Sequence, residues 1–185
     1  MPALESPVCD FGSPIPDFCL PDPAGALFRR DDCTGTRGLL VMFLCNHCPF
    51  VQAVLPRLVE QARALAAEGV GSVALMPNDY RAYPADAPPE MQGLSERMDF
   101  PFPYLVDEGG EVARHFGAVC TPDFFGYNAA GLLQYRGRLD DARLQPATED
   151  TRQELLDAMR AVARTGQGPA EQFPSMGCSI KWADA

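Results

Sequence analysis

A continuous apolar run, Leu39–Leu44, lies between Gly38 and a pair of cysteines. A short run of this kind predicts a strand that is buried on both faces, and Val70–Met76 predicts a second one. Between them, apolar residues recur at helical spacing up to Glu68-Gly69, with Pro56 expected to kink the helix. A strand, a helix and a strand in this order predict a parallel pair with a right-handed crossover, and therefore the α/β class.

The rest of the chain predicts shorter elements. Residues 79–103 are rich in proline and polar residues and form a long connection. The further expected elements are a short helix over 89–98, a strand over 104–106, a short helix over 110–116, a hairpin of 123–127 and 132–136 around Asn128–Gly131, and a closing helix that begins at Thr151 with a capping box and ends at Thr165. Together these elements predict a central mixed sheet flanked by helices.

Both ends of the chain are expected to pack on this core. Residues 1–35 form an N-terminal extension, in which Pro14–Asp22 predicts an extended edge segment followed by a turn at residues 23–25. Residues 168–185 form a C-terminal tail that contains Cys178, Ile180 and the only tryptophan, Trp182. Since an exposed apolar tail would favour aggregation, we expect it to dock, either near the active site or elsewhere on the sheet.

Composition narrows the possible partners. The 185 residues fit one domain, 1–185, and 15 basic against 25 acidic residues give a net charge of −10. Such a charge repels the phosphates of nucleic acids and anionic lipids, so neither is an expected partner. The N-terminus lacks the pattern of a signal peptide, and the apolar runs are too short to span a bilayer. We therefore expect a cytoplasmic protein.

The candidate chemistry follows the first strand directly, in Cys45-Asn46-His47-Cys48-Pro49. Two cysteines at the start of a helix lie where free N–H groups and the helix dipole favour a thiolate, which is the chemistry of thiol–disulfide exchange. We expect Cys45 to face solvent and attack, and Cys48 to be shielded and resolve the mixed disulfide. His47 either stabilises the thiolate of Cys45 or is a solvated residue at the helix start.

Metal binding is the main competitor of the redox interpretation. A structural zinc site needs four ligands, and no second CxxC or histidine pair accompanies this one, because the only histidines are His47 and His115. We expect no metal and no cofactor, and His115 is expected to be structural. A metal-binding or thiol-binding module with Cys45, Cys48, His47 and either Cys120 or Cys178 stays open as a non-enzymatic alternative.

Thr121-Pro122 is a second candidate element of a dithiol site. A proline in the cis form beside the cysteines exposes the backbone of the preceding residue, which then pairs with an extended peptide substrate. Composition does not establish the cis form, because most X-Pro bonds are trans. The position directly before the hairpin at 123–127 is compatible with it.

The order of elements, with CxxC at the tip of the first buried strand, is the thioredoxin arrangement, and the chain resembles thioredoxin-like proteins of the AhpC/TSA (redoxin) group. Within that group it is similar to a bacterial branch of probable thiol–disulfide isomerases and thioredoxin family proteins. The segments that carry the resemblance are 12–20, 45–51 (CNHCPFV), 78–79 with 83–84 and Asp86, 100–107, 120–125, 135–141 and 177–182. The resemblance implies a thioredoxin-like fold, Cys45 and Cys48 as the redox pair, and Pro122 as the cis-proline.

The chain departs from its relatives in two places. Thioredoxin has a buried aspartate six residues before the first cysteine, where this chain has Leu39, and Asp79 at the end of the second strand is either a substitute acid or a turn cap. Peroxiredoxins have a threonine three residues before the reactive cysteine, whereas Met42 precedes Cys45. That second departure argues against peroxidase activity of the usual type.

Seven cysteines are present, and the five outside the motif are treated first as buried structural thiols, namely Cys9, Cys19, Cys33, Cys120 and Cys178. Cys120, beside Thr121-Pro122, is either a packed side chain or a third redox thiol. The role of Cys178 depends on where the C-terminal tail docks.

The sequence thus predicts a thiol–disulfide oxidoreductase that acts on protein or small-molecule disulfides with a thiol or dithiol reductant. A peroxiredoxin-like thiol peroxidase is the alternative enzyme, and a homodimer stays open.

Overall fold

The computed structural model describes residues 3–7 and 10–183, so Cys9 and the outermost residues of both predicted terminal segments lie outside the described residues. The elements, in chain order, are β1 (Ala3–Glu5), β2 (Cys19–Pro21), β3 (Leu27–Arg29), α1 (Arg30–Cys33), β4 (Gly38–Phe43), α2 (Pro49–Ala67), β5 (Val70–Met76), η1 (Pro84–Asp86), α3 (Pro88–Arg97), β6 (Tyr104–Val106), η2 (Glu108–Gly110), α4 (Glu111–Phe116), β7 (Cys120–Thr121), β8 (Asp123–Asn128), β9 (Leu133–Tyr135), α5 (Glu154–Thr165) and β10 (Met176–Ser179).

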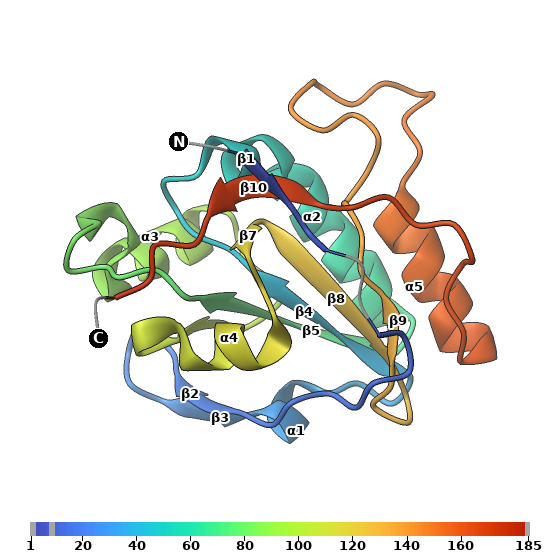
Figure 1. Cartoon of the computed structure of the whole chain (residues 1–185), viewed down its shortest axis with the longest axis horizontal. Helices are drawn as coiled ribbons and strands as arrows, with labels where there is room; N and C mark the ends of the chain where they lie inside the picture. Colours follow the sequence, from blue (N-terminus) through green and yellow to red (C-terminus); the bar gives the residue numbers. More distant parts are fainter. Residues whose placement is uncertain (1–2, 8–9, 184–185) are drawn as a thin grey trace.

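The central sheet is mixed. β4 pairs antiparallel with β8, β8 pairs antiparallel with β9, and β5 pairs parallel with β6. β5 lies along β4, because Arg37 N donates to Gly69 O near the start of both strands and Leu44 N donates to Leu75 O near their ends (Figure 1). The contacts advance in the same direction along both strands, so the predicted parallel pair is confirmed. The α2 helix continues through Pro56.

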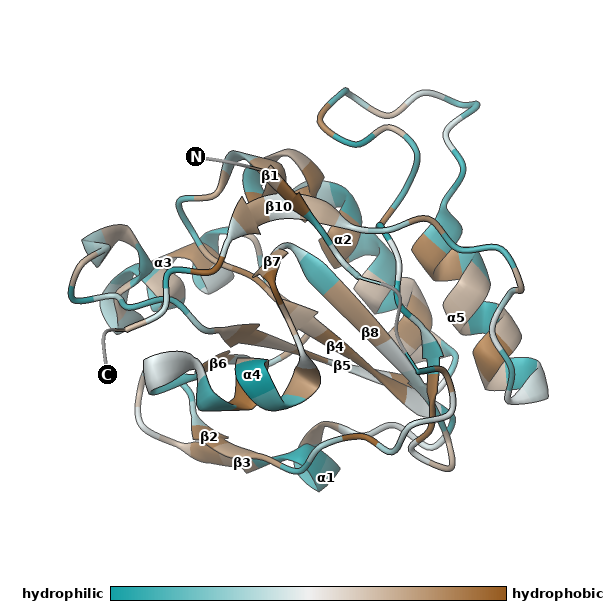
Figure 2. Cartoon of the chain, in the orientation of Figure 1, coloured by the Kyte–Doolittle hydropathy of each residue, from teal (hydrophilic) through white to brown (hydrophobic). Residues whose placement is uncertain are grey.

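The sheet is covered on both faces, which explains why β4 is apolar throughout. Alternate residues of a strand point to opposite faces. Leu40 and Met42 belong to the core formed with α2 and α5, whereas Leu39 and Val41 belong to the core formed with α4 and the N-terminal segment. Figure 2 shows apolar colouring along the inner strands and alternating apolar and polar colouring along α5.

The N-terminal segment forms a hairpin, whereas the sequence predicted only an extended edge segment followed by a turn. β2 and β3 pair antiparallel, and the turn between them is held by Asp22, whose carboxylate accepts from Ala24 N at 2.9 Å and Ala26 N at 2.8 Å. Gly25 in this turn has a φ of +91°, a conformation that glycine adopts without strain. The turn expected at residues 23–25 is therefore confirmed.

The closing helix begins later than predicted, at Glu154, and the expected capping box at Thr151 is absent. Thr151 Oγ1 accepts from Thr148 N at 2.8 Å, which keeps it in the preceding turn. The Glu154 carboxylate, which a capping box needs at the helix start, is held instead by Arg138 at 2.6 Å. A local pattern was thus overridden by two contacts with neighbouring segments.

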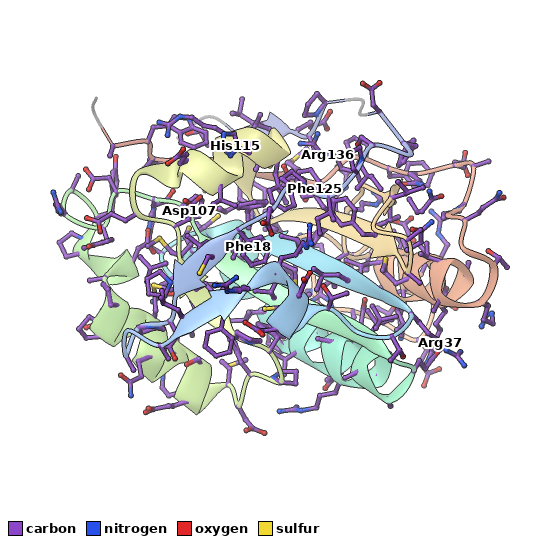
Figure 3. The ribbon with its side chains drawn as sticks, turned by 90° about the horizontal axis from the view of Figure 1, so that it is seen from below. Phe18, Arg37, Asp107, His115, Phe125 and Arg136 are labelled. Carbon is purple, nitrogen blue, oxygen red and sulfur yellow. The ribbon has the colours of Figure 1, made fainter. Side chains whose placement is uncertain are left out.

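A buried ion pair holds the start of β8. Arg136 Nη2 donates to Asp123 Oδ2 at 3.1 Å, and the Arg136 guanidinium lies over the ring of Phe125, 4.4 Å from its centre (Figure 3). Burial raises the pKa of Asp123 to about 6, against the lowering effect of Arg136. Asp123 directly follows Pro122, so this pair anchors the proline segment.

The C-terminal tail docks as β10, in the middle of a small sheet with the order β1-β10-β7 (Figure 1). Cys178 lies opposite Ala3 on one side and Thr121 on the other. The two ends of the described chain therefore meet beside the proline segment. In the described part of the chain, no helix has the length and apolar character needed to cross a membrane.

Candidate active site

The two motif cysteines lie between β4 and α2. Cys48 is the N-cap residue of α2 and Pro49 occupies its first turn, where a proline has no helical hydrogen bond to lose. Cys45 is 1 % exposed and Cys48 is fully buried. The expectation that Cys45 faces solvent is therefore wrong in this structure, because the cysteine is packed against Thr121 of β7, which lies across the motif.

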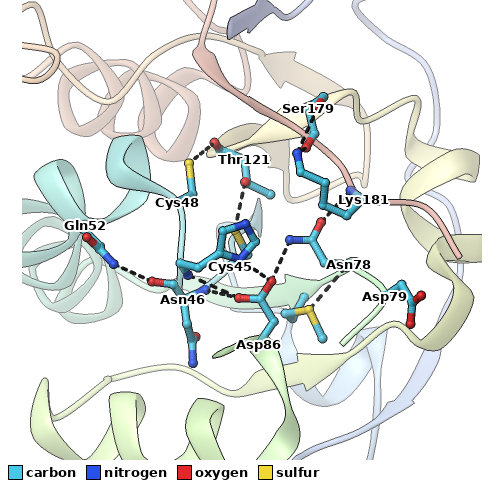
Figure 4. Close-up of polar contacts among 12 residues, drawn as sticks. Cys45, Asn46, Cys48, Gln52, Asn78, Asp79, Asp86, Thr121, Ser179 and Lys181 are labelled. Carbon is cyan, nitrogen blue, oxygen red and sulfur yellow. Dashed lines mark hydrogen bonds and ion pairs between the residues drawn. The ribbon is translucent and has the colours of Figure 1, made fainter. Parts of the chain in front are cut away.

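Cys48 lies in a buried cluster that also contains Cys45 and Cys178. The Cys45 and Cys178 thiols and the backbone N–H groups of Val51 and Cys178 all lower the pKa of Cys48. The hydrogen bond from Cys45, with these further contacts, lowers the pKa of Cys48 to about 5 in spite of its burial. As a thiol, Cys48 donates to Thr121 O at 3.1 Å (Figure 4).

Cys45 has the opposite electrostatic surroundings. The hydrogen bond with Cys48, burial and the charge of Asp86 raise the pKa of Cys45, and only the Thr121 hydroxyl, 3.2 Å from Sγ, acts against them. The two sulfurs titrate as a pair, since each affects the other. Their mutual hydrogen bond favours the negative charge on Cys48 and the proton on Cys45.

Asp86 of η1 is the acid at this site. Its fully buried carboxylate accepts from Asn46 N at 2.8 Å, His47 N at 3.3 Å, His47 Nδ1 at 2.7 Å and Asn78 Nδ2 at 2.8 Å (Figure 4). Sequence reasoning placed Asp86 within a similar segment but gave it no role. No signal of spacing could have found it, because the residue reaches the motif only through the fold of the proline-rich connection.

Asp79, the acid considered from the sequence, does not contact the cysteines. Its carboxylate accepts from Arg81 N at 3.0 Å, which is a turn cap, and Figure 4 shows it on the far side of Asn78 from Cys45. The physical reason lies in the backbone, since Asp79 N donates to Lys181 O at 2.7 Å and the chain turns away there.

The residues between the cysteines are fixed from several elements. Tyr104 donates its hydroxyl to Asn46 Oδ1 at 3.1 Å, and Gln52 Nε2 donates to Asn46 O at 2.9 Å. The His47 ring stacks on Tyr83, with 5.4 Å between ring centres and 10° between the planes. Nδ1 of the His47 ring is bound to Asp86. The other ring nitrogen, Nε2, is buried and has no hydrogen-bond partner among the residues that the structure describes.

The Thr121-Pro122 peptide bond is cis. The backbone of Thr121, however, does not lie open for a substrate, because β10 pairs with it in antiparallel register. Gly177 makes this approach possible, since a Cβ at that position would lie 2.0 Å from Thr121 O. Ser175 adds a further contact, donating its hydroxyl to Pro122 O at 2.7 Å.

A model of the AhpC/TSA family matches residues 11–141 of the chain. The chain belongs to the AhpC/TSA family. Two solved structures resemble this family member over almost their whole length. An uncharacterized conserved protein from Geobacillus kaustophilus is 40 % identical, with a TM-score of 0.93 and coverage of 100 % of this chain and 98 % of that one. A hypothetical protein from Sinorhizobium meliloti is 36 % identical, with a TM-score of 0.92 and coverage of 98 % and 99 %.

More distant structures show the same fold. A secreted disulfide oxidoreductase of Mycobacterium tuberculosis, homologous to Escherichia coli DsbE, is 22 % identical, with a TM-score of 0.54 and coverage of 63 % of this chain and 80 % of that one. The predicted thioredoxin-like α/β fold is thereby confirmed. No curated protein is significantly similar to the chain.

The remaining cysteines of this AhpC/TSA family member differ in their surroundings. Cys120 is fully buried, its thiol donates to Pro122 O at 3.6 Å, and burial raises its pKa, all of which fits a packed residue. Cys33 is buried, and burial raises its pKa to about 11, whereas Cys19 is exposed on β2. Cys178 differs from these, because the docked tail places it opposite Thr121, whose carbonyl accepts from Cys48.

One group of side chains has metal-ligating atoms close together. Ligand atoms of Cys45, His47 and Asp86 lie within 4.8 Å of one another. Both oxygens of Asp86 already accept two hydrogen bonds each, from Asn46, His47 and Asn78. A metal ion would therefore have to displace donors of the network that holds the motif.

A cavity of about 430 Å³ lies beside the cis-proline. Pro122, Phe50 of α2 and Met176 of β10 contribute to its wall, together with the connection from Leu139 to Gln145. Its lining is largely apolar, with charged residues on that connection. The cavity thus offers space for a compact molecule next to the elements that hold both motif cysteines.

Proposed function

We propose that this AhpC/TSA family member is a thiol–disulfide oxidoreductase in which Cys45 attacks and Cys48 resolves. The observation that carries the proposal is the placement of both thiols against Thr121, with Cys45 Sγ 3.2 Å from its hydroxyl and Cys48 Sγ 3.1 Å from its carbonyl. The pKa of Cys48 is lowered to about 5 by the hydrogen bond from Cys45 and by neighbouring N–H groups. A dithiol with one shared proton supplies a thiolate at neutral pH, which is the reactive species in disulfide exchange.

The reaction begins when the shared proton moves from Cys45 to Cys48, so that Cys45 becomes the thiolate. Cys45 attacks a substrate disulfide; the substrate S–S bond breaks, a Cys45–substrate disulfide forms, and the released thiolate takes up a proton. Cys48 then loses its proton and attacks Cys45, and the second substrate thiol leaves. The substrate gains two electrons and the enzyme holds a Cys45–Cys48 disulfide, which a thiol or dithiol donor reduces.

The other site residues position this pair. Asp86 binds the backbone of Asn46 and His47 and thereby fixes the loop between the cysteines. The Thr121 hydroxyl lies 3.2 Å from Cys45 and stabilises its thiolate. Beside Pro122, the Thr121 carbonyl accepts a hydrogen bond from the Cys48 thiol at 3.1 Å.

Compact disulfides suit this site better than extended peptides. β10 occupies the backbone edge of Thr121, whereas the cavity beside Pro122 has about 430 Å³ of space. A small-molecule disulfide, or a protein disulfide on a tight turn, is therefore the substrate class proposed. A compartment with a thiol donor, such as the cytoplasm, fits the regeneration step.

Trapping experiments test the proposal and the roles together. Cys48→Ser should accumulate a mixed disulfide with a small disulfide substrate, detected as an adduct by mass spectrometry, while Cys45→Ser should not. Equal trapping by both variants would overturn the assignment of roles, and trapping by neither would overturn the function. Stopped-flow oxidation by hydrogen peroxide separates the peroxidase alternative, which requires a rate well above that of a free thiol.

A further inference from the structure

We infer that Cys178 is a third redox thiol of this site, which takes over the disulfide from Cys45 and is the thiol that the external reductant reaches. This inference rests on the proposed function. It assigns the C-terminal strand a catalytic part in regeneration rather than a purely structural one.

Cys45, Cys48 and Cys178 belong to one buried cluster and meet at Thr121. The Thr121 hydroxyl lies 3.2 Å from Cys45 Sγ, and the Thr121 carbonyl accepts from Cys48 Sγ at 3.1 Å. The register of β10 places Cys178 directly opposite Thr121, and the Cys178 thiol and N–H help to lower the pKa of Cys48. Gly177 allows β10 to approach Thr121 that closely. The position of Cys178 is thus set by backbone pairing and not by a flexible tail.

Disulfide exchange among these three sulfurs needs no external oxidant. When Cys45 and Cys48 are joined, the Cys178 thiolate attacks Cys48 Sγ, the Cys45–Cys48 bond breaks and a Cys48–Cys178 bond forms. Cys45 leaves as a thiolate and takes the proton that Cys178 has given up. The number of disulfides and of electrons is unchanged, and Cys45 is again free to react.

Of the three cysteines, Cys178 is the most accessible to a reductant from solvent. It is 5 % exposed, compared with 1 % for Cys45 and 0 % for Cys48. Met176 precedes it by two positions, so both side chains point to the same face of β10, and Met176 lines the cavity beside Pro122. A reductant in that cavity would therefore approach the face of β10 that carries Cys178.

Cys120 is the matched control. It lies on β7 opposite Ser179, one position from the Cys178–Thr121 pair, and is also buried. Its thiol points to Pro122 O rather than to the motif. A general effect of removing a buried sulfur beside the proline would appear in both Cys120→Ser and Cys178→Ser, whereas the relay requires an effect of Cys178→Ser alone.

Disulfide mapping after limited diamide oxidation and tryptic digestion tests the inference. Peptide 38–57 carries Cys45 and Cys48, peptide 165–181 carries Cys178 and peptide 115–136 carries Cys120. The wild-type protein should give both an internal disulfide in 38–57 and a link between 38–57 and 165–181. Cys45→Ser should give the link alone, Cys45→Ser with Cys120→Ser should keep it, and Cys45→Ser with Cys178→Ser should lose it.

A link from 38–57 to 115–136, or oxidised wild-type protein in which Cys178 stays fully alkylatable, would overturn the inference. The wild-type result does not depend on the folding of any variant. Disulfide mapping also needs no substrate. Its result can therefore be interpreted even if the mixed-disulfide trapping described above fails. As a kinetic check, reduction of the oxidised protein by glutathione should be at least tenfold slower in Cys178→Ser and unchanged in Cys120→Ser.

Discussion

The two cysteines of one motif lie in contrasting surroundings. Apart from the hydrogen bond between the two thiols and their burial, Cys45 is influenced by the buried carboxylate of Asp86, which holds the loop through backbone and side-chain donors. Cys48 is influenced instead by the thiol and N–H of Cys178 and by the N–H of Val51. The carboxylate disfavours a second negative charge nearby, whereas the N–H groups favour one. The acid therefore positions the motif, whereas the C-terminal strand adds to the effect of Cys45 in favouring the negative charge on Cys48.

The largest effect is expected from removing the acid. Asp86→Ala leaves Asn46 N, His47 N and Asn78 Nδ2 without their buried acceptor. Unpaired buried donors destabilise a protein, so the free energy of unfolding should fall by about 3–5 kcal/mol, together with loss of disulfide reductase activity. Urea denaturation measures the first effect, and unchanged stability would contradict the role given to Asp86.

The negative charge on Cys48 is tested by a pH titration. Because the pKa of Cys48 is lowered to about 5, the thiolate persists above that pH and is protonated as the pH falls through it. The absorbance difference at 240 nm between reduced and oxidised protein should therefore decrease as the pH is lowered through about 5. Cys48→Ser should abolish this step; a step that persists in this variant would place the stable thiolate on Cys45.

A smaller effect is expected from moving β10 without removing any sulfur. In Gly177→Ala the new Cβ meets Thr121 O, 2.0 Å away, so the strand must shift from β7. Overpacking of this kind costs about 1–3 kcal/mol of stability. The pH step should move upward, because Cys178 N–H no longer supports the Cys48 thiolate. An unshifted step would show that β10 does not set the charge.

The smallest effect is expected at Asp79, the matched control for Asp86. Its carboxylate caps a turn through Arg81 N and has no contact with the motif. Asp79→Asn preserves an oxygen acceptor, so the stability should change by less than about 0.5 kcal/mol and the activity should not change. A loss of activity comparable to that of Asp86→Ala would return Asp79 to the site.

The sequence predicted what local patterns determine. Continuous apolar runs marked β4 and β5, helical spacing marked α2, and turn residues marked the β8–β9 hairpin, because each depends on neighbours along the chain. The predicted start of α5 was wrong, because Arg138 from another segment binds the Glu154 carboxylate. Asp86 and Cys178 could not be assigned, because Asp86 lies 40 positions from Asn46, which it binds, and Cys178 lies 130 positions from Cys48. Only the fold of the connection and the pairing of β10 bring them to the motif.

Because β10 lies between β1 and β7, access to the thiols is linked to the pairing of β1 with β10. Any opening that uncovers Cys48 from the β10 side separates Cys178 from Thr121, and the strand that moves also carries the pairing of Leu4 with Gly177. Amide protons of β1 should therefore exchange with solvent deuterium at the frequency with which this side of the dithiol opens. The exchange rate of the β1 amides thus reports how often Cys48, more than 40 residues away in sequence, becomes exposed.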